Sequence, residues 1–130
     1  MITIQSQFAV FLDNRPGTLA ATCQALATAH VNLLALAIVD TVDHVIVRLV
    51  VDKAKEAEAV LCKLHTMVQR REVVVVELSN EPGALARIAE QLAQAGINIE
   101  YAYCTASSSQ RGGLLVLRTN DLEATINALS

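Results

Sequence analysis

Apolar and polar positions along the chain repeat with two periods, which predict strands and helices. Phe8, Val10 and Leu12 recur at every second position, which is typical of a strand. The next element shows helical spacing, because Leu19 and Leu26 fall on one face. Similar patterns predict strands at residues 33–39, 45–51, 66–70, 73–78, 99–105 and 114–118, and helices around residues 57–64, 85–95 and 122–129.

One segment of the sequence occurs twice. Asn-Arg-Pro-Gly-Thr-Leu at residues 14–19 returns as Asn-Glu-Pro-Gly-Ala-Leu at residues 80–85. At the same separation, Val-Asn-Leu at residues 31–33 returns as Ile-Asn-Ile at residues 97–99. The chain is therefore a duplication, and we expect two modules, residues 1–70 and residues 71–130.

The two copies lose their common spacing after the second strand. Asp52 follows the third strand of the first copy, and Asp121 follows that of the second. The second copy therefore has a longer loop, predicted at residues 106–113, whose Ser and Gly content is typical of a surface loop. Asp43 and His44 mark a turn at the corresponding place in the first copy.

The order of elements predicts an α+β fold. Strand, helix, strand, strand, helix, strand is the ferredoxin-like βαββαβ arrangement, an antiparallel sheet with its helices on one face. The second copy reaches Ser130 directly after its last helix, so we expect it to lack its last strand. Such a gap leaves a sheet edge that proteins usually cover. We expect either that residues 66–78, with a short linker at residues 67–72, serve both modules or that a second chain completes the edge.

Composition excludes several classes of function. The chain has 130 residues, with 10 Lys and Arg against 13 Asp and Glu, and this net charge of −3 argues against nucleic-acid binding. Apolar stretches stay far below the roughly 20 residues of a membrane helix. The N-terminus shows no secretory signal, so we expect a cytoplasmic protein without membrane association.

Chemistry-bearing side chains are scattered. The three cysteines form no Cys-x-x-Cys pair, so neither a disulfide framework nor a metal site is expected. His30, His44 and His65 show no metal-ligand spacing. We therefore expect no metal, no cofactor and no enzymatic activity, since an enzyme on this scaffold would need a convergent catalytic cluster.

The repeated motif resembles that of a known family. Asn-x-Pro-Gly-x-Leu after a strand, followed by a helix that ends before Val/Ile-Asn-Leu/Ile, resembles the ACT domain in both copies. The resemblance covers nearly the whole chain and is strongest to small stand-alone tandem ACT proteins of bacteria. It implies a regulatory module that binds a small effector, usually an amino acid, at an interface between ACT modules. The absent last strand of the second copy departs from the family pattern.

The motif suits a zwitterionic ligand. A helix N-terminus offers N–H donors to a carboxylate, and a glycine there allows close approach. Side-chain oxygens could hold the ammonium group. The resemblance implies that the loop of one module faces the start of the second strand of a neighbouring module. The candidate ligand-binding residues are Asp13, Asn14, Gly17, Leu19, Asn32, Asn80, Gly83, Leu85 and Asn98.

Each of these residues also has a purely structural interpretation. Pro-Gly can form only a tight turn between strand and helix, and Asn14 and Asn80 can simply cap helices. Asn32 and Asn98 can bond local backbone. The copies also differ, with Asp13 replaced by Ser79, so we expect unequal affinities or one purely structural copy.

The sequence leaves two functions open. The first is a non-catalytic regulatory or sensor protein for an amino acid, a homodimer because of its apolar strands and unpaired edge. The second is a regulatory subunit of an amino-acid biosynthetic enzyme, acetolactate-synthase-like, which would act through a catalytic partner. The tandem layout argues against close kinship with that small subunit, which resembles one ACT module joined to a different second half.

Overall fold

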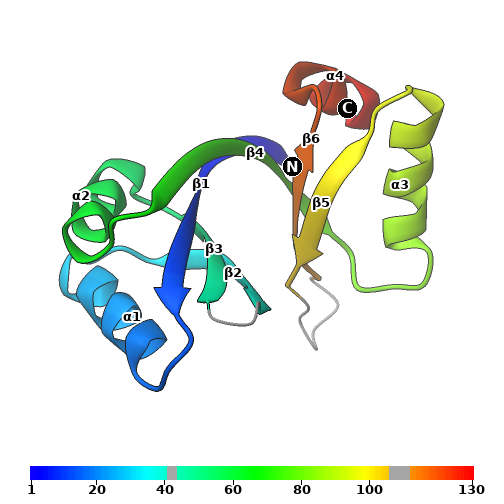
Figure 1. The fold of residues 1–130 in the computed structure, drawn as a ribbon. Helices are drawn as coiled ribbons and strands as arrows, with labels where there is room; N and C mark the ends of the chain where they lie inside the picture. The colour runs from blue at the N-terminus through cyan, green and yellow to red at the C-terminus, as the bar shows by residue number, and fades with distance from the viewer. Residues whose placement is uncertain (41–43, 106–111) are drawn as a thin grey trace. The chain divides into compact units, whose positions relative to one another are not determined.

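Strands and helices follow the predicted order, except that one strand, Val68–Leu78, takes the place of the two predicted at residues 66–70 and 73–78. The computed structural model describes residues 1–40, 44–105 and 112–130. Within these residues the elements are β1 (Ile2–Asp13), α1 (Thr18–Thr28), β2 (Leu33–Asp40), β3 (His44–Val51), α2 (Ala54–Leu64), β4 (Val68–Leu78), α3 (Ala84–Gln94), β5 (Ile99–Cys104), β6 (Gly113–Thr119) and α4 (Leu122–Leu129) (Figure 1). The loop predicted at residues 106–113 lies mostly outside the described residues, as does Asp43 of the predicted turn.

The chain forms two compact units, each with a ferredoxin-like α+β fold. The N-terminal unit comprises Ser6–Arg71, and the C-terminal unit comprises Met1–Gln5 together with Glu72–Ser130. The expected fold of two such modules is confirmed. The module boundaries expected from the duplication, residues 1–70 and 71–130, stay a prediction. The compact units differ from them in that Met1–Gln5 belong with the second copy.

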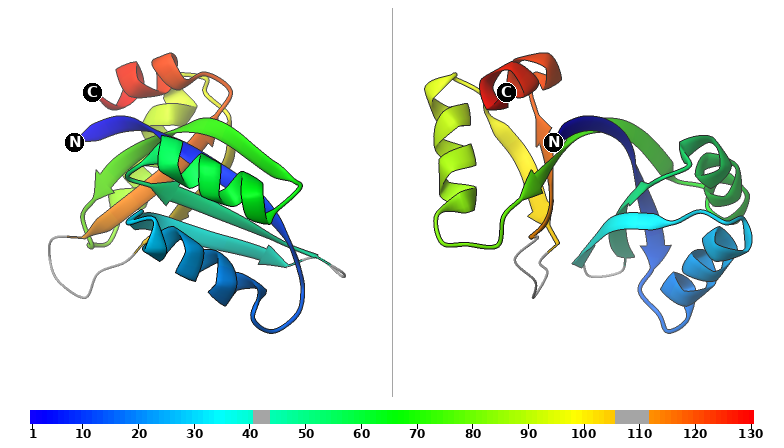
Figure 2. Two further views of the ribbon diagram at one scale, coloured as in Figure 1. Left: turned by 90° about the vertical axis from the view of Figure 1, so that its left-hand side faces the viewer. Right: turned by 180° about the vertical axis from the view of Figure 1, so that it is seen from behind.

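The N-terminal unit is a sheet with helices on one face. Its strands lie in the order β2-β3-β1-β4, with β3 antiparallel to both β1 and β2. Helices α1 and α2 lie side by side against this sheet (Figure 2). The register pairs Phe8 with Leu49 and Val10 with Val47, so that these side chains share the face towards the helices.

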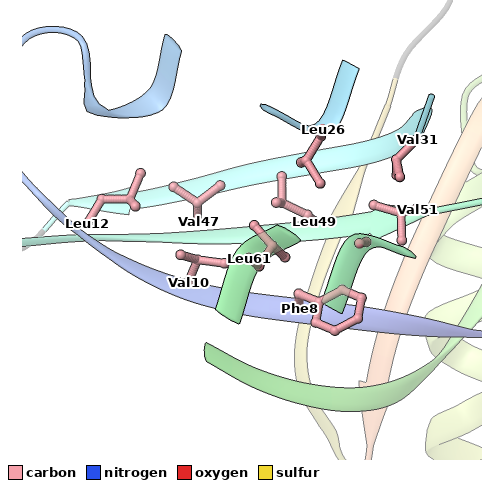
Figure 3. Packing of buried hydrophobic residues seen from close by; sticks show 10 residues of the cluster. Phe8, Val10, Leu12, Leu26, Val31, Val47, Leu49, Val51 and Leu61 are labelled. Atoms are coloured by element: carbon pink, nitrogen blue, oxygen red, sulfur yellow. The ribbon is translucent and has the colours of Figure 1, made fainter. Parts of the chain in front are cut away.

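The core of this unit is formed by that shared face. Figure 3 shows Phe8, Val10 and Leu49 of the strands packed with Leu26 of α1 and Leu61 of α2. All five side chains are 0–1% exposed. Burial of one such side chain stabilises the fold by about 1.5–3 kcal/mol. The alternation that predicted the first strand is therefore the alternation that forms the core.

The C-terminal unit repeats the arrangement with β4, β6 and β5. β6 is antiparallel to both neighbours, and the pairs Val74 with Leu117 and Val76 with Leu115 face the core. Leu92 of α3 completes this cluster. The unit thus uses β4 where the N-terminal unit uses β1.

The N-terminal residues Met1–Gln5 occupy the place of the absent last strand of the second copy. The Glu77 N–H donates to the Met1 carbonyl at 3.1 Å, and the N-terminal ammonium lies 3.7 Å from the Glu77 carboxylate. Ile2 packs against the core of the C-terminal unit. No strand follows α4 in the described residues, as expected, and the sequence did not reveal that the start of the chain covers this edge.

β4 serves both units, which confirms the expectation for residues 66–78, but the linker predicted at residues 67–72 is wrong. β4 runs without interruption, with Arg71 in one unit and Glu72 in the other. Its polar side chains make specific contacts: Arg70 donates to the Ser6 hydroxyl at 3.0 and 3.2 Å and lies 5.9 Å from the centre of the Phe8 ring. The linker was predicted because residues 69–72 are polar, whereas these residues are part of a strand.

Helices α1 and α3 end in the same way. The N–H of Val31 donates to the Leu26 carbonyl, and the N–H of Ile97 donates to the Leu92 carbonyl, both at 2.9 Å. This Schellman arrangement needs a left-handed residue, which is Gly96 (φ 72°) after α3 but His30 (φ 59°) after α1. A side chain in that conformation costs about 1–2 kcal/mol.

Replacement of this histidine by glycine is expected to stabilise the protein. His30→Gly relieves the left-handed strain, and the extra freedom of glycine in the unfolded chain offsets only part of that gain. We expect the free energy of unfolding, measured by urea denaturation, to rise by roughly 0.5–1 kcal/mol. His30→Ala removes the imidazole but keeps the strain, so an equal gain in that variant would contradict the explanation.

Candidate functional site

The Asn-x-Pro-Gly segments form tight turns between strand and helix. Gly17 (φ 92°, ψ −16°) and Gly83 (φ 86°, ψ −6°) are left-handed and immediately precede α1 and α3. Proline followed by a glycine with these angles is a type II turn, and in the second copy the Ala84 N–H donates to the Glu81 carbonyl at 3.3 Å. Pro16 and Pro82 lie in these turns, before the first residue of each helix.

No side chain caps the first turn of either helix. The interpretation of Asn14 as a cap is therefore wrong, and its amide instead donates to the Asp40 carboxylate at 3.4 Å. The N-cap position of α3 is held by Gly83 and not by Asn80. Both N-cap residues are glycines and offer no side-chain acceptor to the first turn, which favours an anion there.

The loop that holds the Asn-x-Pro-Gly segment of the first copy, called the first loop below, carries opposite charges. The Asp13 carboxylate and the Arg15 guanidinium lie 3.8 Å apart, and both side chains are exposed. The Thr18 hydroxyl bonds the carbonyl of Asp13 at 3.0 Å and that of Arg15 at 3.2 Å. These bonds fix the backbone of the loop while its charged groups remain accessible.

The second loop carries its charges differently. Glu81 accepts from the Ser79 hydroxyl at 3.0 Å and from the Arg87 guanidinium at 3.3 Å. Its cation therefore comes from the second turn of α3, whereas that of the first loop lies within the loop. The two copies therefore present different charged groups at the same place, and unequal ligand affinities of the two loops stay a prediction.

Asn32 and Asn98 occupy equivalent positions at the starts of β2 and β5. The Asn32 N–H donates to the Asp52 carboxylate at 2.9 Å, and the Asn98 N–H donates to the Asn120 side-chain oxygen at 3.1 Å. The side chains of both Asn32 and Asn98 are exposed. These contacts use the backbone N–H groups of the two asparagines, so a bond from either side chain to local backbone stays a prediction.

This pairing corrects the sequence alignment after the third strands. The counterpart of Asp52 is Asn120, whereas Asp121 accepts from the Ala124 N–H at 3.0 Å and caps α4. The prediction that Asp121 corresponds to Asp52 is therefore wrong. Two adjacent polar residues, Asn120 and Asp121, both fit the pattern, and only the contacts distinguish them.

A single unit does not bring all of its candidate residues together. The first loop precedes α1 and Asn32 follows it, so the two lie at opposite ends of an 11-residue helix, roughly 16 Å apart along its axis. The same holds for Gly83 and Asn98 across α3. Within each unit, the loop and the asparagine cannot hold one small molecule together.

The two leucines of the motif behave differently. Leu19 is partly buried and packs against the core of the N-terminal unit, so it has a structural role. Leu85 is 49% exposed and stays accessible. Of the two motif leucines, Leu85 is therefore the one whose exposed surface could contact a ligand.

Surface hollows lie beside both loops at equivalent places. The hollow of the C-terminal unit, about 770 Å³, is lined by Leu78, Ser79, Gly83, Ala84, Arg87, Ile88 and neighbouring residues. That of the N-terminal unit, about 370 Å³, is lined by Phe11, Leu12, Asp13, Arg15, Thr18, Ala21, Thr22, Leu64, His65 and Thr66. Both fall near or within the volumes usual for small-molecule sites.

His65, which the sequence analysis set aside, lines the smaller hollow. Its Nε2 lies 3.0 Å from the Thr22 hydroxyl oxygen, and the Thr22 hydroxyl donates to the Thr18 carbonyl at 2.9 Å. Burial lowers the pKa of His65 below its ordinary value, because a charged imidazole loses solvation there. A histidine at a helix end gave no such signal, since its partner Thr22 lies far away in the sequence.

Neither a metal cluster nor a membrane helix is present in the part of the chain that the structure describes. No three His, Cys, Asp or Glu side chains gather closely enough to hold a metal ion. The described helices are also too short or too polar to cross a membrane.

Comparison with known proteins agrees with this geometry. A family profile described as the ACT domain pair matches residues 2–129. The crystal structure of protein BT0572 from Bacteroides thetaiotaomicron is similar at 31% identity, with a TM-score of 0.88 over 98% of this chain and 88% of that one. No curated protein matches the sequence.

More distant structures share the fold. The ligand-free regulatory subunit of aspartate kinase from Thermus thermophilus has 19% identity and a TM-score of 0.73 over 99% of this chain and 95% of that one. Aspartate kinase from Clostridium acetobutylicum has 16% identity and a TM-score of 0.61 over 98% of this chain and 33% of that one.

Removal of the Asp52 carboxylate is expected to weaken the N-terminal unit. Asp52→Ala leaves the Asn32 N–H without its acceptor, and the free energy of unfolding in urea should fall by about 1 kcal/mol. Asp52→Asn supplies the amide that Asn120 uses in the other copy, so it should stay close to wild type. Equal losses in both variants would contradict this role for the side-chain oxygen.

Acid is expected to destabilise the protein through His65. Its folded-state pKa lies below the ordinary 6.5, so below about pH 6.5 the unfolded chain binds more protons than the folded one. The free energy of unfolding therefore falls as pH decreases through this range. Urea denaturation across pH should give a smaller fall in His65→Gln, and parallel profiles for the two proteins would contradict the assignment.

Proposed function

Because the chain belongs to the ACT domain pair family, we propose that it is a non-catalytic regulatory protein that binds an amino acid at its two Asn-x-Pro-Gly loops. The ligand would shift the population of a conformation that a partner recognises. The proposal includes the place that the ACT resemblance implies for such a ligand, which is an interface between ACT modules.

The observation that carries the proposal is the state of the two loops. A Cβ at Gly17 would meet no atom within 4 Å, and one at Gly83 would meet only the Arg87 guanidinium at 3.6 Å. Space is therefore open beside the glycine that starts each helix. The Ala84 N–H of α3 already donates to the Glu81 carbonyl, so the donors available to a carboxylate are the other N–H groups of each first turn.

The side chains around the first loop suit the other end of a zwitterion. The exposed carboxylate of Asp13 can accept from an ammonium group, and Arg15 can balance the local charge. In the second loop Glu81 supplies the carboxylate and exposed Leu85 supplies apolar surface. We infer that the two loops differ in affinity and in the side chain that they accept.

The assembly and compartment are also part of the proposal. We propose a homodimer in the cytoplasm, and the apolar strands support the association of two copies. The regulatory subunit of aspartate kinase from Thermus thermophilus has the same fold, which supports an output through protein contact.

A second candidate is a separate regulatory subunit of a catalytic enzyme. The regulatory subunit of aspartate kinase from Thermus thermophilus has the same fold over nearly its whole length. A likeness at this identity concerns the fold, so the partner stays a prediction, as does the acetolactate-synthase-like partner considered from the sequence. Recovery of a stoichiometric biosynthetic enzyme with the tagged protein would favour this candidate.

Amino-acid binding is tested by thermal unfolding against all standard amino acids. A ligand at a hundredfold excess over its Kd adds about 2.7 kcal/mol, which corresponds to an increase in Tm on the order of 10 °C. We expect one or a few amino acids to raise the Tm selectively. If none does so in correctly folded protein, the proposal is overturned.

Glycine variants locate the binding. Gly17→Asn and Gly83→Asn place a side chain in the open space and keep a residue that tolerates a left-handed backbone. The double variant should lose the ligand-dependent increase in Tm. Gly96→Asn is the matched control, because Gly96 is also left-handed with open space but lies at the end of a helix. Equal loss in the control would show that the effect is not local.

A further inference from the structure

The hollow of the N-terminal unit combines apolar walls with several polar side chains. It lies between the end of β1, the first turns of α1 and the connection from α2 to β4. Phe11, Leu12 and Ala21 give it apolar walls, and its volume is about 370 Å³. A pocket with apolar walls and a few converging polar groups is the usual form of a small-molecule site.

The hydrogen bonds of Thr22 fix the state of His65. Thr22 has one hydroxyl hydrogen, which goes to the Thr18 carbonyl at 2.9 Å. We therefore assign Nε2 of His65, 3.0 Å from the hydroxyl oxygen, as the donor in this pair. The neutral imidazole then has a lone pair on Nδ1, which becomes a second donor when His65 is protonated.

The charged groups around His65 are few. Asp13 and Arg15 line the hollow from β1 and its following loop, while the lining residues of α1 are neutral. On α2, Lys63 lines a different hollow together with Ala25 and Val60. Asp13 and Arg15 pair with each other at 3.8 Å, so protonation of His65 would leave one positive charge in excess.

The second copy lacks the two threonines and the histidine of the first. Ala84 stands in place of Thr18 and Ile88 in place of Thr22, and no histidine lines the hollow of the C-terminal unit. The comparison within one chain shows that the fold does not require the hydroxyl groups or the imidazole. They therefore serve the first copy specifically.

We propose that the hollow of the N-terminal unit binds a small carboxylate between Arg15 and protonated His65, so that binding at the first loop takes up a proton. The inference rests on the proposed function, because it names the ligand chemistry and regulation of the first loop. It makes the two copies distinct sensors, of which only the first responds to acid.

Physical chemistry links the ligand to the proton. A carboxylate beside the imidazole favours its charged form and raises the pKa that burial had lowered. By reciprocity, a protonated His65 binds the carboxylate more tightly. A shift of one pKa unit corresponds to about a tenfold change in affinity.

The test follows the imidazole protons of the three histidines by NMR in full-length protein, with sodium acetate as the probe and sodium chloride at equal ionic strength as the control. We expect acetate to raise the pKa of His65 by about one unit and to leave His30 and His44 unchanged. Equal titration of His65 in acetate and chloride, or equal shifts in all three histidines, would overturn the proposal.

Two variants separate the groups involved. His65→Gln keeps an amide donor for Thr22 but cannot titrate, so acetate affinity should no longer increase between about pH 7.5 and about pH 5.5. Arg15→Gln should weaken acetate binding about tenfold, whereas Arg87→Gln, its matched control in the other unit, should leave the His65 response unchanged. Retention of the pH dependence in His65→Gln would contradict the proposal.

This readout is independent of the amino-acid screen. If amino acids raise the Tm through Gly17 or Gly83 but acetate leaves His65 unaffected, the proton-linked site fails and the proposed function stands. If acetate acts on His65 but no amino acid raises the Tm, the hollow binds carboxylates and the amino-acid sensor fails.

Discussion

The turn formed by Pro and Gly at the start of each first helix determines most of the candidate site. Proline fixes φ at the second position of a type II turn, and the third position then needs a positive φ that glycine adopts without strain. Gly17 and Gly83 both have this conformation. The helix starts at the next residue, and its first N–H groups consequently point out beside an open glycine.

The same constraint explains why hollows lie beside both loops. Since the turn returns the chain sharply from strand to helix, the end of the strand and the first turns of the helix form two walls of a recess in each unit. What differs is the set of side chains on these walls. Thr18, Thr22 and His65 line one recess, while Ala84 and Ile88 replace the two threonines in the other.

Much of the fold could be predicted from the sequence, because it depends on local spacing. The alternation at Phe8, Val10 and Leu12 gave the first strand, and the repeated Asn-x-Pro-Gly motif gave the duplication. Residues 2–5 were missed as a strand, since they alternate apolar and polar positions over too short a stretch to stand out. Their role depends on pairing with Glu77, which lies far away in the sequence.

The site was harder to predict for the same reason. The glycines could be identified, because a left-handed backbone restricts the residue type. Asn14 could not be assigned, because its partner Asp40 comes after another helix and strand. His65 gave no signal at all, since only the fold brings it to Thr22. Local constraints are thus readable from sequence, whereas contacts between distant segments need the structure.

The central claim is that the two Asn-x-Pro-Gly loops are where a small ligand binds. Backbone amide NMR spectra of the 15N-labelled protein, recorded with and without each amino acid, test this most directly. A binding amino acid is expected to shift amide signals of residues 13–19, 79–85 or both, while signals of the sheet cores stay in place. Saturable binding that leaves both loops unshifted would contradict it.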